Sequence, residues 1–243
     1  RSKKCTSVVQ HLAAESGRNV EVLNMGLPAA GPRNYVGMIG KDAADLHVDI
    51  VGVVLFLGND VLQAHPDFVT RLWFGAPREV LVSPYALGWS AQYLSLYRML
   101  RESTRLLRER VRADSDGAFS RESFLAVEAQ RSVVFAADPS EFVRDSLASV
   151  VQITQQMQAV AKARQMQFFV VLAPDELQVD PRLQAELFSA DQLQSADYDF
   201  GRLPRELQRK LEAAGIPVLD LLPRFAAETA RELYARHDTH WNE

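Results

Sequence analysis

The stretch that decides the fold reads Asp49-Ile-Val-Gly-Val-Val-Leu-Phe-Leu-Gly-Asn-Asp60. Its apolar run has no polar alternation, which predicts a strand covered on both faces in the middle of a parallel sheet. The run ends in Gly58-Asn59-Asp60, at the carboxyl end of the strand, where open α/β sheets place their ligands. Asn and Asp after a strand also serve as turn residues or as a helix N-cap, so this tripeptide alone favours a structural role.

Length and composition are those of an ordinary globular protein. The chain has 243 residues, 47% of them hydrophobic and 24% charged, which is enough for one large α/β domain. A net charge of −4 gives no indication of a nucleic-acid partner. The single cysteine, Cys5, excludes an internal disulfide. No apolar run approaches the roughly 20 residues that a membrane-spanning helix needs.

Helical and extended patterns alternate along the chain, which predicts the α/β class with a parallel sheet. No linker or repeat divides it, so we expect one domain over residues 1–243 with a helical insertion at about 63–165. Residues 61–88 and 176–201 read as irregular segments over the carboxyl edge of the sheet. The predicted strands are 20–25, 50–57, 168–173 and 216–221, and the predicted helices are 6–16, 34–46, 89–112, 121–137, 140–165, 203–214 and 223–233.

Several familiar sites are absent from the sequence. The loop Gly26–Gly31 has the glycine spacing of a phosphate loop, but Pro32 stands where its lysine must be. No Gly-x-Gly-x-x-Gly, His-Glu-x-x-His or Gly-x-Ser-x-Gly occurs, and one cysteine cannot build a thiolate zinc site. We therefore expect neither a cofactor nor a bound metal.

The chemistry that remains lies in four residues. Asp238 and His240 are two apart, which in an extended segment puts both side chains on one side, so the carboxylate can orient the imidazole as a general base. Gly26 could offer its N–H, and Asn59 its side-chain amide, to a developing oxyanion. Each residue alone has a plain structural explanation as a turn. Because all four follow or lie near predicted core strands, their convergence favours a site.

Three blocks together resemble the SGNH (GDSL-like) hydrolase family. They are Val20-Glu-Val-Leu-Asn-Met-Gly26, the stretch 49–60, and Leu233-Tyr-Ala-Arg-His-Asp-Thr-His-Trp-Asn242. The resemblance implies a flavodoxin-like three-layer α/β/α sandwich with about five parallel strands. It also implies a serine esterase, lipase, or O-acetyl esterase or acetyltransferase acting on carbohydrate.

The same resemblance assigns roles to the four residues. Gly26 becomes the backbone oxyanion donor and Asn59 the side-chain donor, while Asp238 orients His240, the base. The Asp-x-His-Trp-Asn form is similar to the alginate acetyltransferase-type branch, which favours an acetyl ester of a polysaccharide or small molecule as substrate. It also favours a cell-envelope or secreted location over a cytoplasmic one.

The family's first block, Gly-Asp-Ser with the nucleophile, does not occur in the sequence. One loop and one helix should separate it from the second block, by roughly thirty residues, which places it before Arg1. Ser2, Ser7 and Ser83 lack the motif. We therefore expect a piece of a longer protein that cannot complete acyl transfer by itself.

Two other functions stay open. A metallophosphoesterase is suggested by Asp45-Leu-His47, Gly58-Asn59-Asp60 and His237-Asp-Thr-His240, provided that these groups converge in space. A non-catalytic scaffold that binds a glycan or a protein is suggested by the missing nucleophile. It is also suggested by arginines spaced three or four apart along the predicted helix 89–112, although a solvated face paired with Glu102 and Glu109 explains that stripe more simply.

Overall fold

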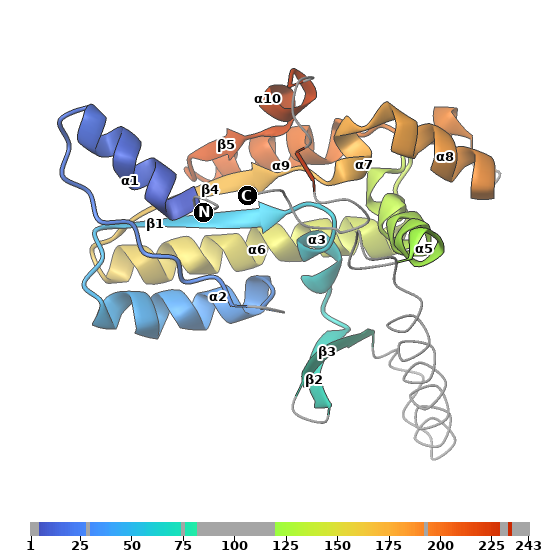
Figure 1. The fold of residues 1–243 in the computed structure, drawn as a ribbon. Helices are drawn as coiled ribbons and strands as arrows, with labels where there is room; N and C mark the ends of the chain where they lie inside the picture. Colours follow the sequence, from blue (N-terminus) through green and yellow to red (C-terminus); the bar gives the residue numbers. More distant parts are fainter. Residues whose placement is uncertain are drawn as a thin grey trace, which may run out of the picture.

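The computed structural model of the protein describes residues 5–27, 30–73, 76–81, 120–191, 194–228 and 233–234. Helices and strands alternate along these residues, which confirms the α/β class. Their main sheet has three parallel strands in the order β1 (Ile50–Phe56), β4 (Gln167–Ala173) and β5 (Val218–Asp220) (Figure 1). β1 and β4 pair from Ile50 opposite Gln167 to Phe56 opposite Ala173, so their carboxyl ends lie level.

One face of this sheet is covered by α6 (Glu141–Ala163), which lies along the strands with α2 (Pro32–Met38) beside it (Figure 1). α6 begins at Ser140, whose Oγ accepts a hydrogen bond from the Val143 N–H at 3.3 Å. The apolar stripe predicted for this helix is confirmed as buried, because its positions recur every three or four residues and face the sheet. The stripe consists of Val143, Leu147, Val150, Thr154, Met157 and Ala161.

The prediction that the stretch 50–57 is covered on both faces is wrong for the described structure. Val53, Leu55 and Leu57 are buried, whereas Ile50 and Val54 are 55% and 49% exposed. Successive strand residues point to opposite faces, so one row faces α6 and the other faces outward. Among the described strands β1 is an edge strand, paired only with β4. An apolar run therefore indicates that a strand can be buried, but it does not indicate how many strands or helices cover it.

The strand predicted at 20–25 is also wrong, because the described residues there belong to no strand. Val20 and Leu23 are exposed. A strand forms only where another pairs with it, and none of the described segments pairs with this one. The described residues instead include an antiparallel hairpin, β2 (Phe68–Trp73) and β3 (Ala76–Leu81), in a segment expected to be irregular. The expected five parallel strands are thus not confirmed.

The other described helical segments agree only in part with the predicted ones. The helix predicted at 121–137 ends at Ser132 and continues as a 3-10 turn, and the segment 176–201, expected to be irregular, contains two helices. The helix predicted at 89–112 lies outside the described residues, and the single domain with its insertion at 63–165 stays a prediction. Of the described helices, none is long and apolar enough to cross a bilayer. The segments are α1 (Cys5–Glu15), η1 (Ile39–Ala43), α3 (Asp60–Gln63), α5 (Arg121–Ser132), η3 (Val133–Phe135), α7 (Glu176–Val179), α8 (Pro181–Asp191), η4 (Ser195–Asp197), α9 (Arg202–Ala213) and α10 (Leu222–Ala226).

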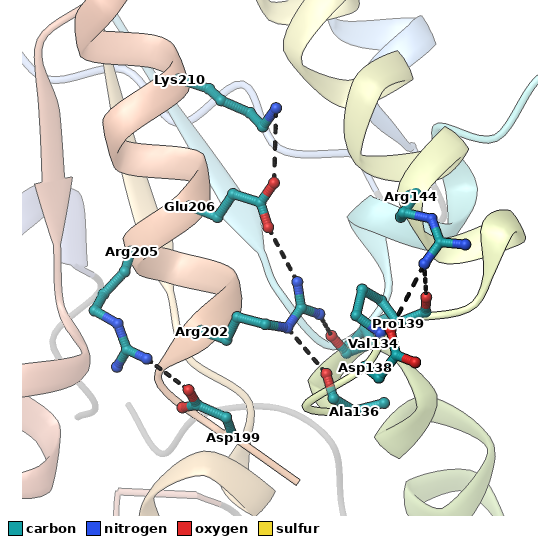
Figure 2. Close-up of polar contacts among 10 residues, drawn as sticks. All are labelled: Val134, Ala136, Asp138, Pro139, Arg144, Asp199, Arg202, Arg205, Glu206 and Lys210. Atoms are coloured by element: carbon teal, nitrogen blue, oxygen red, sulfur yellow. Dashed lines mark hydrogen bonds and ion pairs between the residues drawn. The ribbon is translucent and has the colours of Figure 1, made fainter. Parts of the chain in front are cut away.

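Arg202 joins the start of α9 to the turn after α5 (Figure 2). Its guanidinium donates to the carbonyl oxygens of Ala136 at 2.9 Å and Val134 at 2.8 Å, and to Glu206 at 3.1 Å. The side chain is 15% exposed, so these carbonyls would lose their donors in a poorly hydrated place if it were removed. Arg205, on the same helix, pairs with Asp199 but is 66% exposed.

Replacing Arg202 with methionine should therefore lower the free energy of unfolding by about 2–3 kcal/mol, the range for hydrogen bonds to a charged group that is only slightly exposed. Arg205→Met is the matched control and should cost less than about 1 kcal/mol, because solvent screens exposed ion pairs. Urea unfolding of the two variants measures both values. Equal losses would contradict the role given to Arg202.

Candidate active site

Asn59 lies where β1 ends, at the carboxyl edge of the sheet. The Leu57 N–H donates to the Ala173 carbonyl at 2.9 Å, which extends the pairing with β4 beyond the strand itself. Asp60 Oδ2 accepts the Phe56 N–H at 2.8 Å and closes the turn. Asn59 then opens α3, but its side chain makes no capping bond. The structure thus places Asn59 as predicted, with an amide that no hydrogen bond to the described residues uses.

Gly58 permits the side chains of Asp175 and Phe56 to pack against the backbone just after β1. A β-carbon at Gly58 would overlap the Asp175 Oδ2 atom and would lie 2.7 Å from the Phe56 ring. Asp175 follows β4 after Pro174, and its Oδ1 caps α7 by accepting the Leu177 N–H at 2.9 Å. The carboxylate of Asp175 is therefore held at one end by α7 and packs at the other against the backbone before Asn59.

Three carboxyl groups gather at this edge, on α5 and at the start of α7. Burial raises the pKa of Glu128 to about 9, and the charge and hydrogen bond of Asp175 add to the effect. Burial likewise raises the pKa of Glu176 to about 7, with the charges of Asp180 and Asp175 contributing. Arg131 opposes the rise at Glu128. Perturbed acids of this kind are frequent at functional sites.

Tyr234 connects the C-terminal motif to the same edge. Its hydroxyl donates to the Pro174 carbonyl at 2.8 Å, and the residue is buried. Burial raises its pKa, and the charges of Asp175, Glu176 and Glu128 act in the same direction. Asp238 follows four residues later, a span of at most about 14 Å of extended chain. Asp238 and His240 themselves lie outside the described residues.

Gly26 lies in an exposed loop, and its N–H donates to the Asn24 Oδ1 atom at 2.9 Å. The far end of that loop is tied to α3, since Arg33 donates to the Ala64 carbonyl at 2.9 Å and Gly31 leaves no room for a β-carbon beside Gln63. The described contacts therefore bring the end of the loop to α3 and do not bring Gly26 itself to Asn59.

A comparison with protein families bears directly on this edge. Residues 133–243 match the family model described as the SGNH hydrolase-like domain of acetyltransferase AlgX. The match covers just under half of the chain and confirms the SGNH resemblance there. It begins at η3 and includes α6, β4, Asp175 and Tyr234. No curated protein and no solved structure matches the chain.

The two described groups suggested for a metallophosphoesterase do not converge, and the third, residues 237–240, lies outside the described residues. Asp45 and His47 precede β1, whereas Asn59 and Asp60 follow it, and the seven residues of β1 separate the two pairs by about 23 Å. Both Asp45 and His47 are exposed. Over the described ranges, no group of three or more His, Cys, Asp or Glu side chains could hold a metal ion.

Sequence reasoning missed the polar residues that surround this edge: Glu128, Arg131, Asp175, Glu176 and Tyr234. Asp175 could have been found, because it follows the buried run 168–173 as Asn59 follows the run 50–57. Glu128 carried a weaker signal, its position four residues after the buried Phe124 on the apolar side of α5. From sequence alone, an acidic residue at such a helix position is expected at the surface, because the residues that pack against it are not known.

Gly58→Ala should lower the free energy of unfolding by about 1–3 kcal/mol, because the added methyl group must displace Asp175 or the Phe56 ring. Gly37→Ala in α2 is the control: its β-carbon meets nothing within 4 Å, and alanine should stabilise the helix by about 0.5–1 kcal/mol. Thermal unfolding compares the two. A Gly58→Ala protein as stable as Gly37→Ala would contradict the close contact with Asp175.

Proposed function

We propose that the chain forms most of an SGNH-type serine esterase or acetyltransferase. The matched domain belongs to an acetyltransferase, which supports the coarse assignment to ester hydrolysis or acetyl transfer. The single observation that carries the proposal is that Gly58, next to Asn59, and Tyr234, four residues before Asp238, both contact the turn that follows β4. Both contacts lie at the carboxyl edge of β1 and β4, one between Gly58 and Asp175 and the other between Tyr234 and Pro174.

In the proposed mechanism a serine outside residues 1–243 is the nucleophile. His240 accepts its proton as the hydroxyl oxygen attacks the ester carbonyl, and Asp238 orients and stabilises the imidazolium. The Asn59 amide and the Gly26 N–H donate to the oxyanion of the tetrahedral intermediate. His240 then gives the proton to the leaving alcohol, and an acyl-serine remains. Water or a sugar hydroxyl, deprotonated by His240, releases the acyl group.

Gly26 must change its hydrogen bond to take part. Its N–H now donates to Asn24, and an oxyanion must replace that acceptor. A charged oxygen is the stronger acceptor, since hydrogen bonds to ionised groups are roughly twice as strong as neutral ones. In this proposal the Asn24 side chain accepts the Gly26 N–H until the oxyanion replaces it, and so keeps that N–H oriented for the ligand.

We propose an acetyl ester of a polysaccharide or of a small molecule as the substrate, with no cofactor and no nucleic acid. A five-stranded flavodoxin-like sandwich and a cell-envelope or secreted location belong to the same proposal. A second candidate is a catalytically inactive scaffold that binds a glycan or a protein, favoured by the lack of Gly-Asp-Ser in the sequence.

A fluorophosphonate probe separates the two on a polypeptide that also carries a Gly-Asp-Ser block. The enzyme should be labelled, His240→Ala should abolish labelling, and Asn59→Ala should lower kcat on an acetyl ester by about 10²–10³ with little change in KM. His11→Ala, an exposed position in α1, should leave both unchanged. Absence of labelling together with retained glycan binding would favour the scaffold instead.

A further inference from the structure

Glu128 and Asp175 are two carboxyl groups, each 1% exposed, that meet where β1 and β4 end. They come from α5 and from the N-cap of α7, and both carboxyl groups lie within 4 Å of the same nitrogen of Arg131. Glu128 Oε2 and Asp175 Oδ2 have no hydrogen-bond donor among the described residues. Two buried carboxyl oxygens without a donor are stabilised when one of the two groups carries a proton.

Arg131 does not neutralise the pair. Its guanidinium lies 3.3 Å from Glu128 Oε1 and 3.8 Å from Asp175 Oδ2, and 5.6 Å from the centre of the Phe56 ring. One positive charge faces two acids, and the nearby Glu176 adds a further negative charge to the surroundings of Glu128. Two carboxylates that share a buried site cannot both ionise readily, so one of them keeps its proton. In an O–H···O hydrogen bond between Glu128 and Asp175, the protonated group then donates and the other group accepts.

We propose that Glu128 and Asp175 share one proton, and that this buried pair is the positioning element for the turn that carries Asn59. The proposal rests on the proposed function, because it acts on turnover only through the Asn59 amide. Asp175 Oδ2 packs against the Gly58 backbone, so the direction of Asp175 fixes the start of the turn. Loss of the shared proton places a second charge beside Asp175 and moves it off Gly58.

The pH dependence follows from the charged groups that face the pair, which are Arg131 on α5 and Glu176 on α7, with the Tyr234 hydroxyl nearby. The folded protein keeps Glu128 protonated up to a pKa of about 9, whereas the unfolded chain releases that proton near its ordinary pKa of about 4.3. Between these values the folded state binds more protons than the unfolded state. The contribution of Glu128 to the free energy of unfolding is therefore fully present below the lower value and falls as the pH rises toward the upper one.

A neutral isostere tests the shared proton without an activity assay. From pH 8 to 9, where Glu176 with its pKa of about 7 has largely titrated, the wild-type Tm should fall as the pH rises. Glu128→Gln should flatten this fall and raise the Tm at pH 9 by several degrees. It should also remove the infrared carbonyl band of a protonated carboxyl group. Glu122→Gln, exposed on the same helix, should follow the wild type. A Glu128→Gln curve parallel to the wild type, with the band unchanged, would overturn the shared proton.

Turnover of an acetyl ester tests the positioning, in the polypeptide that carries the Gly-Asp-Ser block. Glu128→Gln can still donate to Asp175 and should keep kcat within about twofold of the wild type, well inside the 10²-fold effect of a 1 Å displacement. Glu128→Met has a similar volume but no donor, so kcat should fall between about tenfold and 10²-fold while KM stays unchanged. Equal kcat values for the two variants would refute the positioning while leaving the esterase intact. An inactive wild type that still shows the stability result would refute the proposed function and not the shared proton.

Discussion

The parallel pairing of β1 with β4 determines where Asn59 and Asp175 lie. Its register brings Phe56 level with Ala173, so the residues that follow the two strands meet at one edge. Asn59 comes from one strand end and Asp175 from the other, and Gly58 lets the Asp175 carboxylate pack against the backbone just before Asn59. The pairing itself is stabilised by one buried face, formed by alternate residues of both strands against α6. The core therefore fixes the geometry of the edge.

That edge carries a set of polar groups that a purely structural sheet would lack. Burial disfavours the charged form of Glu128, and apolar residues of similar size would fill the same place with less desolvation. Such groups are expected where function requires them. Tyr234 adds to the same region a hydrogen bond from the far end of the chain, to the Pro174 carbonyl. The edge thus joins segments that are more than a hundred residues apart in sequence, from Gly58 to Tyr234.

Sequence patterns predicted the elements whose neighbours are close in the chain or whose periodicity is strong. The apolar runs of β1 and β4 and the long stripe of α6 are of this kind. Sequence patterns failed where a structure depends on a partner elsewhere in the chain. Residues 20–25 form no strand, because no described strand pairs with them. Val54 faces outward, although the run 50–57 was expected to be covered on both faces. Asn59 was predicted by its place after a strand. The place of Glu128 was not predicted, because its environment depends on Asp175, which lies 47 residues later in the chain.

The claim on which the rest depends is that His240 reaches the edge where Asn59 lies. The most direct measurement is a crystal structure of the polypeptide with its Gly-Asp-Ser block, phosphonylated at the serine. We predict the phosphonyl oxygen within about 3 Å of the Asn59 amide and the His240 imidazole within about 3 Å of the serine oxygen. His240 in solvent at the amino end of β1, on the side of His47, would contradict the account.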